Sequence, residues 1–539
     1  MKNRRQFLET VAAAGAATGL MAGKLAAQTD SPTVLDGRLE KAYAYRVGRA
    51  DHYRAMGPVE HVTNGDEQKY PNRINSFSKT LLHDQFGHVS RDGYASLIRA
   101  TNSGRKEDFE RILRGGNVRL KNPTGAYNYQ LAGADQSQYL LKPPPAFDSA
   151  AQAAAMIELY WQSVCRDIPF AEYDTDPTVA KACRDLTMRT GYTGPRVDGR
   201  VTPACVFRGQ TPGDLVGPPV SQFLLAPFKM GHLMVDQKQL SAQPGVDFMT
   251  TYADYLQIQF GEGKGPGDRS ETVPRYVRNG RDLARLVYVD WSFSPHYHAL
   301  WHLLGYGADA YSESNPYTGS RGQEPYINFG PPDSFEYVAR AAKPAFNAAW
   351  FQKWMVHRQA RPEVMACRVH NHMLQVQLYP IHESLLNSAA AEAVYQKNGT
   401  YLLPQAYSPG SPAHSTYPSG HATVGGAVVT MLKALFKESF VLPNPVVASA
   451  DGLELLPYKG PDLTVGNELN KLAFNIAMAR NWAGIHFRYD AWEGMQLGER
   501  VAINILADMA AGYMDEFAGL AFTRFGGTKI NVCGGCVSP

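Results

Sequence analysis

Three short segments in the last third of the chain carry side chains that can bind a tetrahedral oxyanion. They are Lys353 with Arg361-Pro362, Pro418-Ser419-Gly420-His421, and Arg480 with His486 and Asp490. Together they supply three fixed cations, a hydroxyl, the backbone of a helix start and two imidazoles. We predict that these groups converge on one anion. Each charge-assisted hydrogen bond to that anion would contribute about 1.5 to 3 kcal/mol.

The first two segments are predicted to lie at helix ends. We expect a helix that starts at Pro344 and ends before Pro362, since proline suits a first helical position and disfavours a helix at the residue before it. Lys353 and Arg361 are eight residues apart, so both side chains can point to one side. Ser419-Gly420 precedes a helical pattern, and a helix start favours an anion through its free N–H groups and dipole.

The third segment combines a buried arginine with a histidine and a carboxylate. Arg480 falls on the apolar stripe of a predicted helix over 467 to 480, where a guanidinium needs an anion within reach. We expect Gly484 to break this helix and turn His486 back toward the arginine. Asp490 could then hold one ring nitrogen of His486 and leave the other free to ligate or attack.

Each of these residues also has a purely structural interpretation. Arg480 could pair with a core carboxylate such as Glu468 or Glu493, His486 could be a satisfied core histidine, and Lys353 could lie in solvent. The occurrence of all three segments together favours the anion site.

Two other clusters carry weaker signals. His296, His298 and His302 have the spacing of metal-binding histidines on a helix, but they lie among aromatic residues without an obvious carboxylate set, which favours packing. Cys533 and Cys536 form one close pair near the C-terminus, which favours a local disulfide or two free thiols over a zinc or redox site.

The three motifs resemble those of the vanadium haloperoxidases and their relatives, the type-2 phosphatidic acid phosphatases. Both groups share a Lys…Arg-Pro, a Pro-Ser-Gly-His and an Arg-x5-His-x3-Asp signature, found here from Lys353 to Asp490. Seven residues separate Lys353 from Arg361, where the phosphatase pattern has six, and Ala479 replaces the serine common before the arginine. Both departures, with wider similarity over roughly residues 40 to 525, favour the algal-type bromoperoxidases.

The resemblance implies a role for each motif residue. His486 would give vanadate its single covalent protein ligand, and His421 would meet the apical oxygen or water and handle a proton. The vanadate oxygens would be held by Lys353, Arg361, Arg480, the Ser419 hydroxyl and the Gly420 N–H. Lys353 would also stabilise charge during turnover, Asp490 would support His486, and His357 would be either a supporting residue or merely structural.

As a function, the resemblance implies a vanadate-dependent haloperoxidase that uses hydrogen peroxide to convert halide to hypohalous acid, which halogenates a small organic acceptor. His414, seven residues before His421 as in the bromoperoxidases, favours bromide with iodide. The family implies one vanadate per subunit and a homo-oligomer. Two alternatives stay open: an exported acid phosphatase of the same superfamily with His486 as nucleophile, and a non-catalytic oxyanion-binding protein of the periplasm.

Composition agrees with a large enzyme. The chain has 539 residues, 44% of them hydrophobic, and a net charge of +3 gives no case for nucleic-acid binding. Helical patterns dominate and strand signals are sparse, so we expect a mainly α protein, which the resemblance makes a pair of four-helix bundles. We divide it into an N-terminal helical half (35–330), a C-terminal catalytic bundle (331–527) and a tail (528–539).

The N-terminus reads as an export signal. Arg4-Arg5 precedes an uncharged apolar stretch from Val11 to Gly23, and residues 1–27 therefore resemble a twin-arginine signal peptide. The apolar stretch is too short to span a bilayer comfortably, so no permanent membrane anchor is expected. The predicted location is the bacterial periplasm or the outside of the cell.

Overall fold

The computed structural model describes residues 36–263, 265–291 and 293–538. The chain divides into two units, Met1–His52 and Tyr53–Pro539. Helix α2 (Arg38–Ala55) buries none of its residues, and the predicted signal peptide lies outside the described residues.

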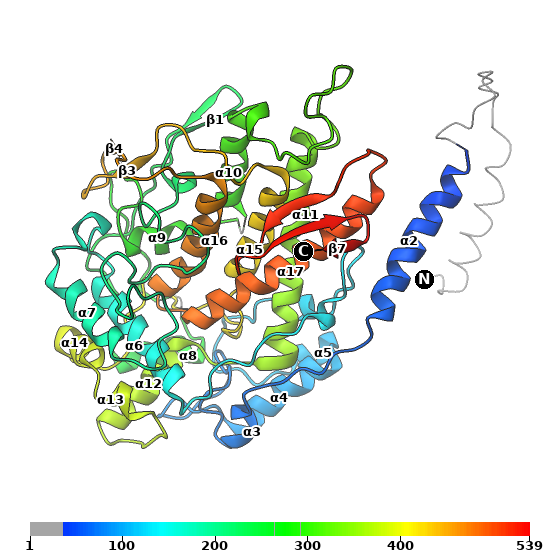
Figure 1. The fold of residues 1–539 in the computed structure, drawn as a ribbon. Coiled ribbons are helices and arrows are strands. Elements are labelled where there is room, and N and C mark those ends of the chain that lie inside the picture. The colour runs from blue at the N-terminus through cyan, green and yellow to red at the C-terminus, as the bar shows by residue number, and fades with distance from the viewer. Residues whose placement is uncertain (1–35, 264, 292, 539) are drawn as a thin grey trace. The chain divides into compact units, whose positions relative to one another are not determined.

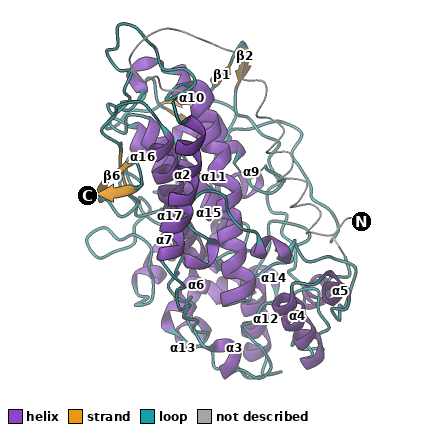
Figure 2. Ribbon diagram, turned by 90° about the vertical axis from the view of Figure 1, so that its right-hand side faces the viewer, coloured by secondary structure: helices purple, strands orange, loops and turns teal. Residues whose placement is uncertain are grey.

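Four long helices form the centre of the second unit. They are α11 (Pro331–Phe351), α15 (Gly420–Leu435), α16 (Val465–Trp482) and α17 (Arg488–Gly512). Helix α15 packs against the other three, and Figures 1 and 2 show α11, α15 and α17 running side by side. Every residue of α15 except His421 is buried, because its sequence is apolar or small with Lys433 as its one fully charged side chain.

Glycines allow α15 and α17 to approach closely. A Cβ atom on Gly498 would lie 2.0 Å from the carbonyl oxygen of Thr423, and one on Gly426 would lie 2.3 Å from that of Met495. Side chains at these positions would push the helices apart. The spacing of the two helices therefore depends on these glycines, and this spacing sets how α17 meets the start of α15.

The remaining helices surround this centre. Those of the N-terminal half are α3 (Asp66–Lys69), α4 (Arg91–Ser103), α5 (Lys106–Glu110), α6 (Ala150–Cys165), α7 (Pro177–Thr187), α8 (Tyr252–Phe260), α9 (Gly280–Leu286) and α10 (Ser294–Gly305). Those after α11 are η6 (Gln352–His357), α12 (Pro362–Met373), α13 (Glu383–Leu386) and α14 (Ala389–Asn398). Short 3-10 turns are η1 (Pro123–Tyr127), η2 (Gln136–Gln138), η3 (Phe170–Glu172), η4 (Gln222–Leu224) and η5 (Ala308–Ala310).

Strands are short and antiparallel. Two hairpins pair β1 (Phe228–Met230) with β2 (Leu233–Val235) and β3 (Val446–Ala448) with β4 (Leu455–Pro457). A three-stranded sheet has the order β5 (Leu520–Thr523), β6 (Lys529–Cys533) and β7 (Cys536–Ser538). A disulfide joins Cys533 to Cys536, which is one of the two states expected from their spacing.

The described helices confirm the prediction of a mainly α helical-bundle fold. The two predicted halves lie within one unit, since α16 packs against both α6 and α9. The terminal sheet crosses the boundary predicted at residue 527, because β5 pairs with β6.

The predicted helix start at Pro344 is wrong. Helix α11 begins at Pro331, directly after Gly330, and continues through Pro344. The two consecutive prolines Pro331 and Pro332 provide the starting signal. Pro344 is tolerated inside the helix, although it removes one backbone donor, because α11 packs against α15.

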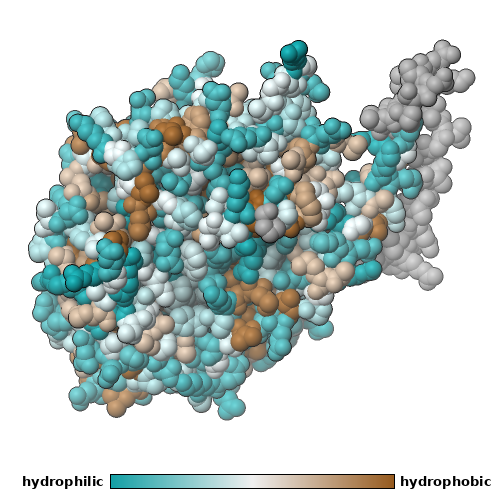
Figure 3. All heavy atoms as spheres, in the orientation of Figure 1, coloured by the Kyte–Doolittle hydropathy of each residue, from teal (hydrophilic) through white to brown (hydrophobic). Residues whose placement is uncertain are grey.

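The surface drawn in Figure 3 is mostly polar, with apolar side chains in small separate patches. Within the described ranges, no helix is both long and apolar enough to cross a membrane.

Candidate active site

The three predicted segments meet at His486. Arg361 ends the turn before α12, and its guanidinium lies 2.9 Å from Nε2 of His486. Lys353, in the wide turn η6, donates hydrogen bonds of 2.7 Å to the carbonyl oxygens of Ser415 and Thr416, directly before the Pro-Ser-Gly-His motif. Segments separated by more than 100 residues thus form one buried group of polar side chains.

The ring of His486 has a partner at each nitrogen, a carboxylate at Nδ1 and a cation at Nε2. Its Nδ1 donates to Oδ2 of Asp490 at 2.8 Å, as predicted, and Nε2 faces Arg361. Burial lowers the pKa of His486 well below its usual value, and the charge of Arg361 lowers it further. The imidazole is therefore neutral, with a lone pair on Nε2 directed among cations.

Asp490 is fixed by several donors at one oxygen. Its Oδ2 accepts hydrogen bonds from the Thr416 hydroxyl and from the backbone N–H of Phe487 at 2.9 Å, in addition to that from His486. Burial raises the pKa of Asp490 to about 6, while its hydrogen bonds and the nearby Lys353 oppose the rise. Thr416 also lies 3.1 Å from Nδ1 of His486, so it helps to set the orientation of the ring.

The cations are buried without carboxylate partners. Lys353 and Arg361 are 0% and 1% exposed, and Arg480 is 7% exposed. In the part of the chain that the structure describes, none of the three forms an ion pair with a carboxylate. Burial lowers the pKa of Arg361 to about 10, and the charges of Glu363 and Asp490 oppose this shift. Burial also lowers the pKa of Lys353 well below its usual value, and the charge of Arg361 adds to the shift.

Arg480 occupies the end of the apolar stripe, as predicted. It donates to the carbonyl oxygen of Val287 at 2.6 Å and lies over the ring of Tyr407, 5.3 Å from its centroid, while its Nε has no partner. Glu468 pairs instead with Lys471, so the alternative core pairing with Glu468 is wrong. A buried arginine with an unsatisfied donor is costly unless a bound anion accepts that hydrogen bond, so Arg480 is suited to bind an anion.

The backbone at the start of α15 faces the same region. Ser419 is the N-cap residue, and Gly420 is the first helical residue. A Cβ on Gly420 would come within 3.2 Å of the Phe346 ring and 3.3 Å of the Trp350 ring, so a larger residue would require these rings to shift by a few tenths of an ångström. The predicted helix start is therefore present and closely packed, with its N–H groups unshielded by any side chain on Gly420.

Among the motif side chains of the site, His421 is the one that is partly exposed. It is oriented by Asp290, which lies outside the three motifs. Its Nε2 lies 3.0 Å from Oδ1 of Asp290. Burial lowers the pKa of His421, and the charge of Asp290 opposes this shift. With Nε2 bound to a carboxylate, Nδ1 is the atom that can accept a proton.

His414 and His357 differ in their contacts with this group. His414 contacts the Arg361 guanidinium, with 3.0 Å between NH2 and Nδ1, and its ring lies 4.8 Å from that of Trp350. His357 packs edge-on against Tyr417 at 4.8 Å, and neither of its ring nitrogens has a hydrogen-bond partner among the described residues. His357 thus supports the segment before Ser419 by packing and does not contact the cations.

The other histidine cluster packs against aromatic side chains. His298 and His302 lie against the ring of Phe228, with centroids 5.1 and 4.9 Å apart. Over the ranges that the structure describes, no group of three or more histidine, cysteine or acidic side chains is arranged to hold a metal ion. The packing interpretation agrees with these contacts.

Three residues of the site were missed from the sequence. They are Thr416, Asp290 and Tyr407. Thr416 stands two residues before Pro418, so its closeness to the motif was a usable signal. Asp290 and Tyr407 lie in loops without periodicity, 131 and 73 residues from their partners in the chain, and no local pattern could have identified them.

The fold and the site both have counterparts among known proteins. A sequence model of the VCPO second helical-bundle domain matches residues 334–515, which include all three motifs. The chain is 34% identical to a vanadium-dependent bromoperoxidase of Ascophyllum nodosum over 530 residues, covering 93% of this chain and 94% of the relative. It is 28% identical to a vanadium-dependent bromoperoxidase of Corallina officinalis, covering 92% of this chain and 99% of the relative.

A solved structure matches over nearly the whole chain. It is the homohexameric structure of the second vanadate-dependent bromoperoxidase of Ascophyllum nodosum, with a TM-score of 0.90 and 29% identity. The match covers 95% of this chain and 94% of that chain.

Proposed function

Because this chain belongs to the algal-type vanadium-dependent bromoperoxidase family, we propose that it is a vanadate-dependent haloperoxidase. It oxidises bromide, and also iodide, with hydrogen peroxide to hypohalous acid, which halogenates small organic acceptors. The observation that supports this proposal most is that three buried cations, none of them paired with a carboxylate among the described residues, lie close to the neutral imidazole of His486.

The residues present fit vanadate. Arg480 has an unsatisfied Nε, Gly420 is the first residue of α15, where a helix lacks intrahelical acceptors for its N–H groups, and the neutral ring of His486 carries a lone pair on Nε2. His486 would ligate the metal, and one vanadate is proposed per subunit. Its oxygens would be held by Lys353, Arg361, Arg480, Ser419 and the Gly420 N–H. When bound, vanadate supplies Lewis acidity that polarises hydrogen peroxide without a change of its own oxidation state.

The protein's own groups position and move protons around this centre. His421, held through Nε2 by Asp290, accepts a proton from hydrogen peroxide at Nδ1 and later returns it to the hypohalite product. Lys353 is fixed by two carbonyl oxygens and supplies a point charge that stabilises developing negative charge. His414 is proposed to favour bromide and iodide through its contact with Arg361.

The proposal is tested by removing all metal from the protein, adding orthovanadate, and measuring bromination of a phenolic probe with hydrogen peroxide and bromide. Bromination is expected to return only with vanadate and to disappear in His486→Ala, while the exposed His232→Ala leaves it unchanged. Phosphoester cleavage is measured in parallel. Vanadate-independent bromination, or phosphoester cleavage without any bromination, would defeat the assignment.

Two further properties are part of the proposal. We propose a homo-oligomer, as the related Ascophyllum enzyme is homohexameric, and light scattering of the purified protein measures the assembly directly. We also propose export by the twin-arginine pathway to the periplasm or beyond, on the basis of Arg4-Arg5. Replacing both arginines by lysine is expected to leave the protein in the cytoplasm, and unchanged export of that variant would contradict the pathway.

A further inference from the structure

Two residues of the anion site, Arg480 and Tyr407, also line a pocket of about 870 Å³. Its other walls come from segments 117–121, 258–263 and 409–413, with Lys79 and Tyr288. The pocket is large enough for a molecule with one aromatic ring, since sites for small organic ligands span roughly 300 to 1,000 Å³. A molecule held in this pocket would therefore lie beside the anion site.

The charge of the lining is strongly positive. Four cations contribute to it, Lys79, Arg119, Lys121 and Arg480, whereas Glu262 is the one carboxylate among the described residues of the lining. Lys79 is buried, donates to the carbonyl oxygens of Pro409 and Ser411, and pairs with the buried Glu363 carboxylate at 3.8 Å, so the excess positive charge comes mainly from Arg119, Lys121 and Arg480. A concave surface with this excess of one charge attracts anions and raises their local concentration.

Two of these cations are free to meet a ligand. Arg119 and Lys121 are exposed, and in the described structure their side chains make no hydrogen bond or ion pair. Exposed charges of this kind can change partner without disturbing the core. They provide the recognition of a negative group at the rim.

The inner wall offers an aromatic and apolar surface. The rings of Tyr288 and Tyr407 stack with centroids 4.2 Å apart and an angle of 19°. Tyr407 is buried and Tyr288 is half-buried, and Ile258, Leu120 and Pro412 add apolar surface. Arg480 lies over the ring of Tyr407 and Arg285 over that of Tyr288, so the stacked pair offers its ring edges to an aromatic ligand.

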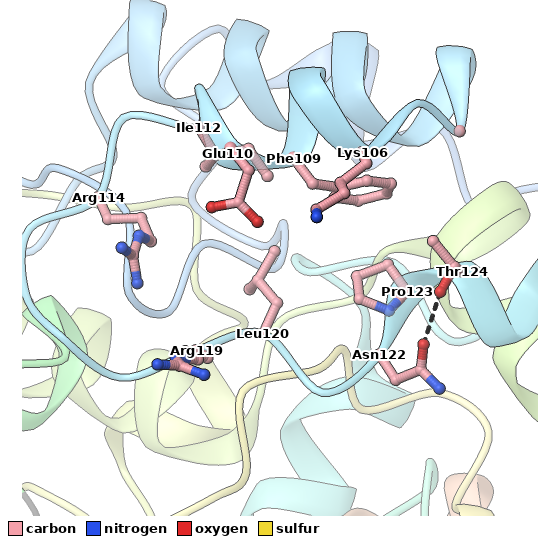
Figure 4. A pocket seen from close by; sticks show the side chains of 11 residues that line it. Lys106, Phe109, Glu110, Ile112, Arg114, Arg119, Leu120, Asn122, Pro123 and Thr124 are labelled. Carbon is pink, nitrogen blue, oxygen red and sulfur yellow. Dashed lines mark hydrogen bonds between the residues drawn. The ribbon is translucent and has the colours of Figure 1, made fainter.

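The rim of the pocket, formed by Arg119 and Lys121, borders a neighbouring hollow of about 610 Å³, which is drawn in Figure 4. Arg119 and Leu120 line both spaces, and Figure 4 shows Arg114 on the same side of the hollow as Arg119. Lys106 also lines the hollow, with Glu110 as the acidic member. The positive surface around the pocket is thus wider than the pocket itself.

We infer that this pocket binds the organic acceptor and selects for an aromatic ring that carries a carboxylate, such as a phenolic acid. Arg119 and Lys121 bind the carboxylate, and the ring lies against the Tyr288 wall near Arg480. This inference rests on the proposed function, which supplies hypobromous acid from bromide and hydrogen peroxide. In the transfer, the O–Br bond of hypobromous acid breaks and a C–Br bond forms on the ring, whose proton joins the hydroxide as water.

A competition experiment tests the inference. The holoenzyme receives equal amounts of 4-hydroxybenzoate and its neutral methyl ester at neutral pH, and the ratio of brominated products is compared with that given by reagent hypobromite. Intrinsic ring reactivity cancels in this comparison. The enzyme is expected to enrich the carboxylate product about threefold or more, as two exposed ion pairs allow. Identical ratios with enzyme and reagent would overturn the inference.

Variants locate the effect at the rim. R119Q/K121Q is expected to return the product ratio to that of the reagent. The control R111Q/K181Q removes two exposed cations that line neither space and is expected to keep the enrichment. Equal enrichment in both double variants would contradict the assigned residues.

A binding measurement separates this inference from the proposed function. Calorimetry of the vanadate-free protein is expected to show 4-hydroxybenzoate binding more tightly than the ester, with the difference removed in R119Q/K121Q. If no bromination of either acceptor occurs but this binding holds, the proposed function fails and the site stands. If the ester is brominated but neither the binding difference nor the enrichment appears, the site fails and the proposed function stands.

Discussion

At the scale of single residues, the site depends on a histidine that is kept neutral in a positively charged environment. Burial and Arg361 lower the pKa of His486, and Asp490 fixes its Nδ1 as a donor. These effects leave Nε2 as the only ring atom able to ligate. The buried cations then need a ligand anion, because they have no carboxylate partners among the described residues.

This arrangement predicts that Asp490→Asn weakens vanadate binding by about 10- to 100-fold, since partners of a ligating histidine commonly contribute that much. The amide preserves size but no longer accepts from His486 with a full negative charge. Equilibrium dialysis with metal analysis measures the affinity. Glu493→Gln on the same helix is the control, because Glu493 is only partly buried and makes no ion pair in the described structure. Equal affinities in both variants would contradict the role of Asp490.

Much of this site could be predicted from local sequence, and the reasons are physical. Arg480 stood out because a cation on an apolar stripe needs an anion, and Asp490 because its spacing from His486 fits one helical turn. Asp290 and Tyr407 could not be identified, since their contacts depend on how loops fold over the bundle. Hydrogen bonds between distant loops leave no periodic pattern in the chain.

At the scale of elements, the site requires close packing of α15 against α17. Ser419, at the start of α15, donates its backbone N–H to the carbonyl oxygen of Asp490 at 3.0 Å, which ties the anion-binding helix start to the histidine segment. Gly426 and Gly498 allow this approach farther along the same two helices. The position of the Pro-Ser-Gly-His motif relative to the histidine segment therefore depends on how α15 packs against α17.

We predict that Gly498→Ala destabilises the protein by about 1 to 3 kcal/mol or more, because its Cβ would lie 2.0 Å from the carbonyl oxygen of Thr423. Gly305→Ala, at the end of α10, is the matched control, since its Cβ would meet no atom within 4 Å. That change is expected to be neutral or to stabilise by up to about 1 kcal/mol. Urea denaturation measures both, and equal stability of the two variants would contradict the packing argument.

Helix boundaries were less predictable than helix existence. Lys353 was predicted to lie within a helix that starts at Pro344, but α11 starts 13 residues earlier and changes at Gln352 to the wider turn η6, which contains Lys353. The single proline gave a false starting signal because tertiary packing of α11 against α15 outweighs one missing backbone hydrogen bond.

At the scale of the whole molecule, several buried histidines make folding sensitive to acid. Burial lowers the pKa of His296 and His357 to about 3 and that of His302 to about 4, from a usual value of 6.5. Above pH 6.5 these groups are neutral in both the folded and the unfolded chain and do not affect stability. Below it the unfolded chain binds protons that the folded chain does not.

The free energy of unfolding is therefore predicted to fall as the pH drops from about 6.5 toward 4. Each such histidine contributes up to about 1.4 kcal/mol per pH unit. Urea midpoints at a series of pH values, with calorimetric proton uptake on unfolding, measure this dependence. His302→Gln is expected to reduce the slope, whereas the exposed His232→Gln is expected to keep it. A midpoint that is constant or rises on acidification would contradict the prediction.

The central claim is that distant segments fold into one cationic pocket that binds vanadate through His486. Titration of the metal-free protein with orthovanadate, followed by equilibrium dialysis, tests it most directly. We predict saturation at one vanadate per chain. In His486→Ala the affinity for vanadate is expected to fall by at least about 100-fold, which exceeds the loss expected for a residue that only supports His486, such as Asp490. Vanadate binding of equal affinity in wild type and His486→Ala, with both proteins folded, would contradict the claim.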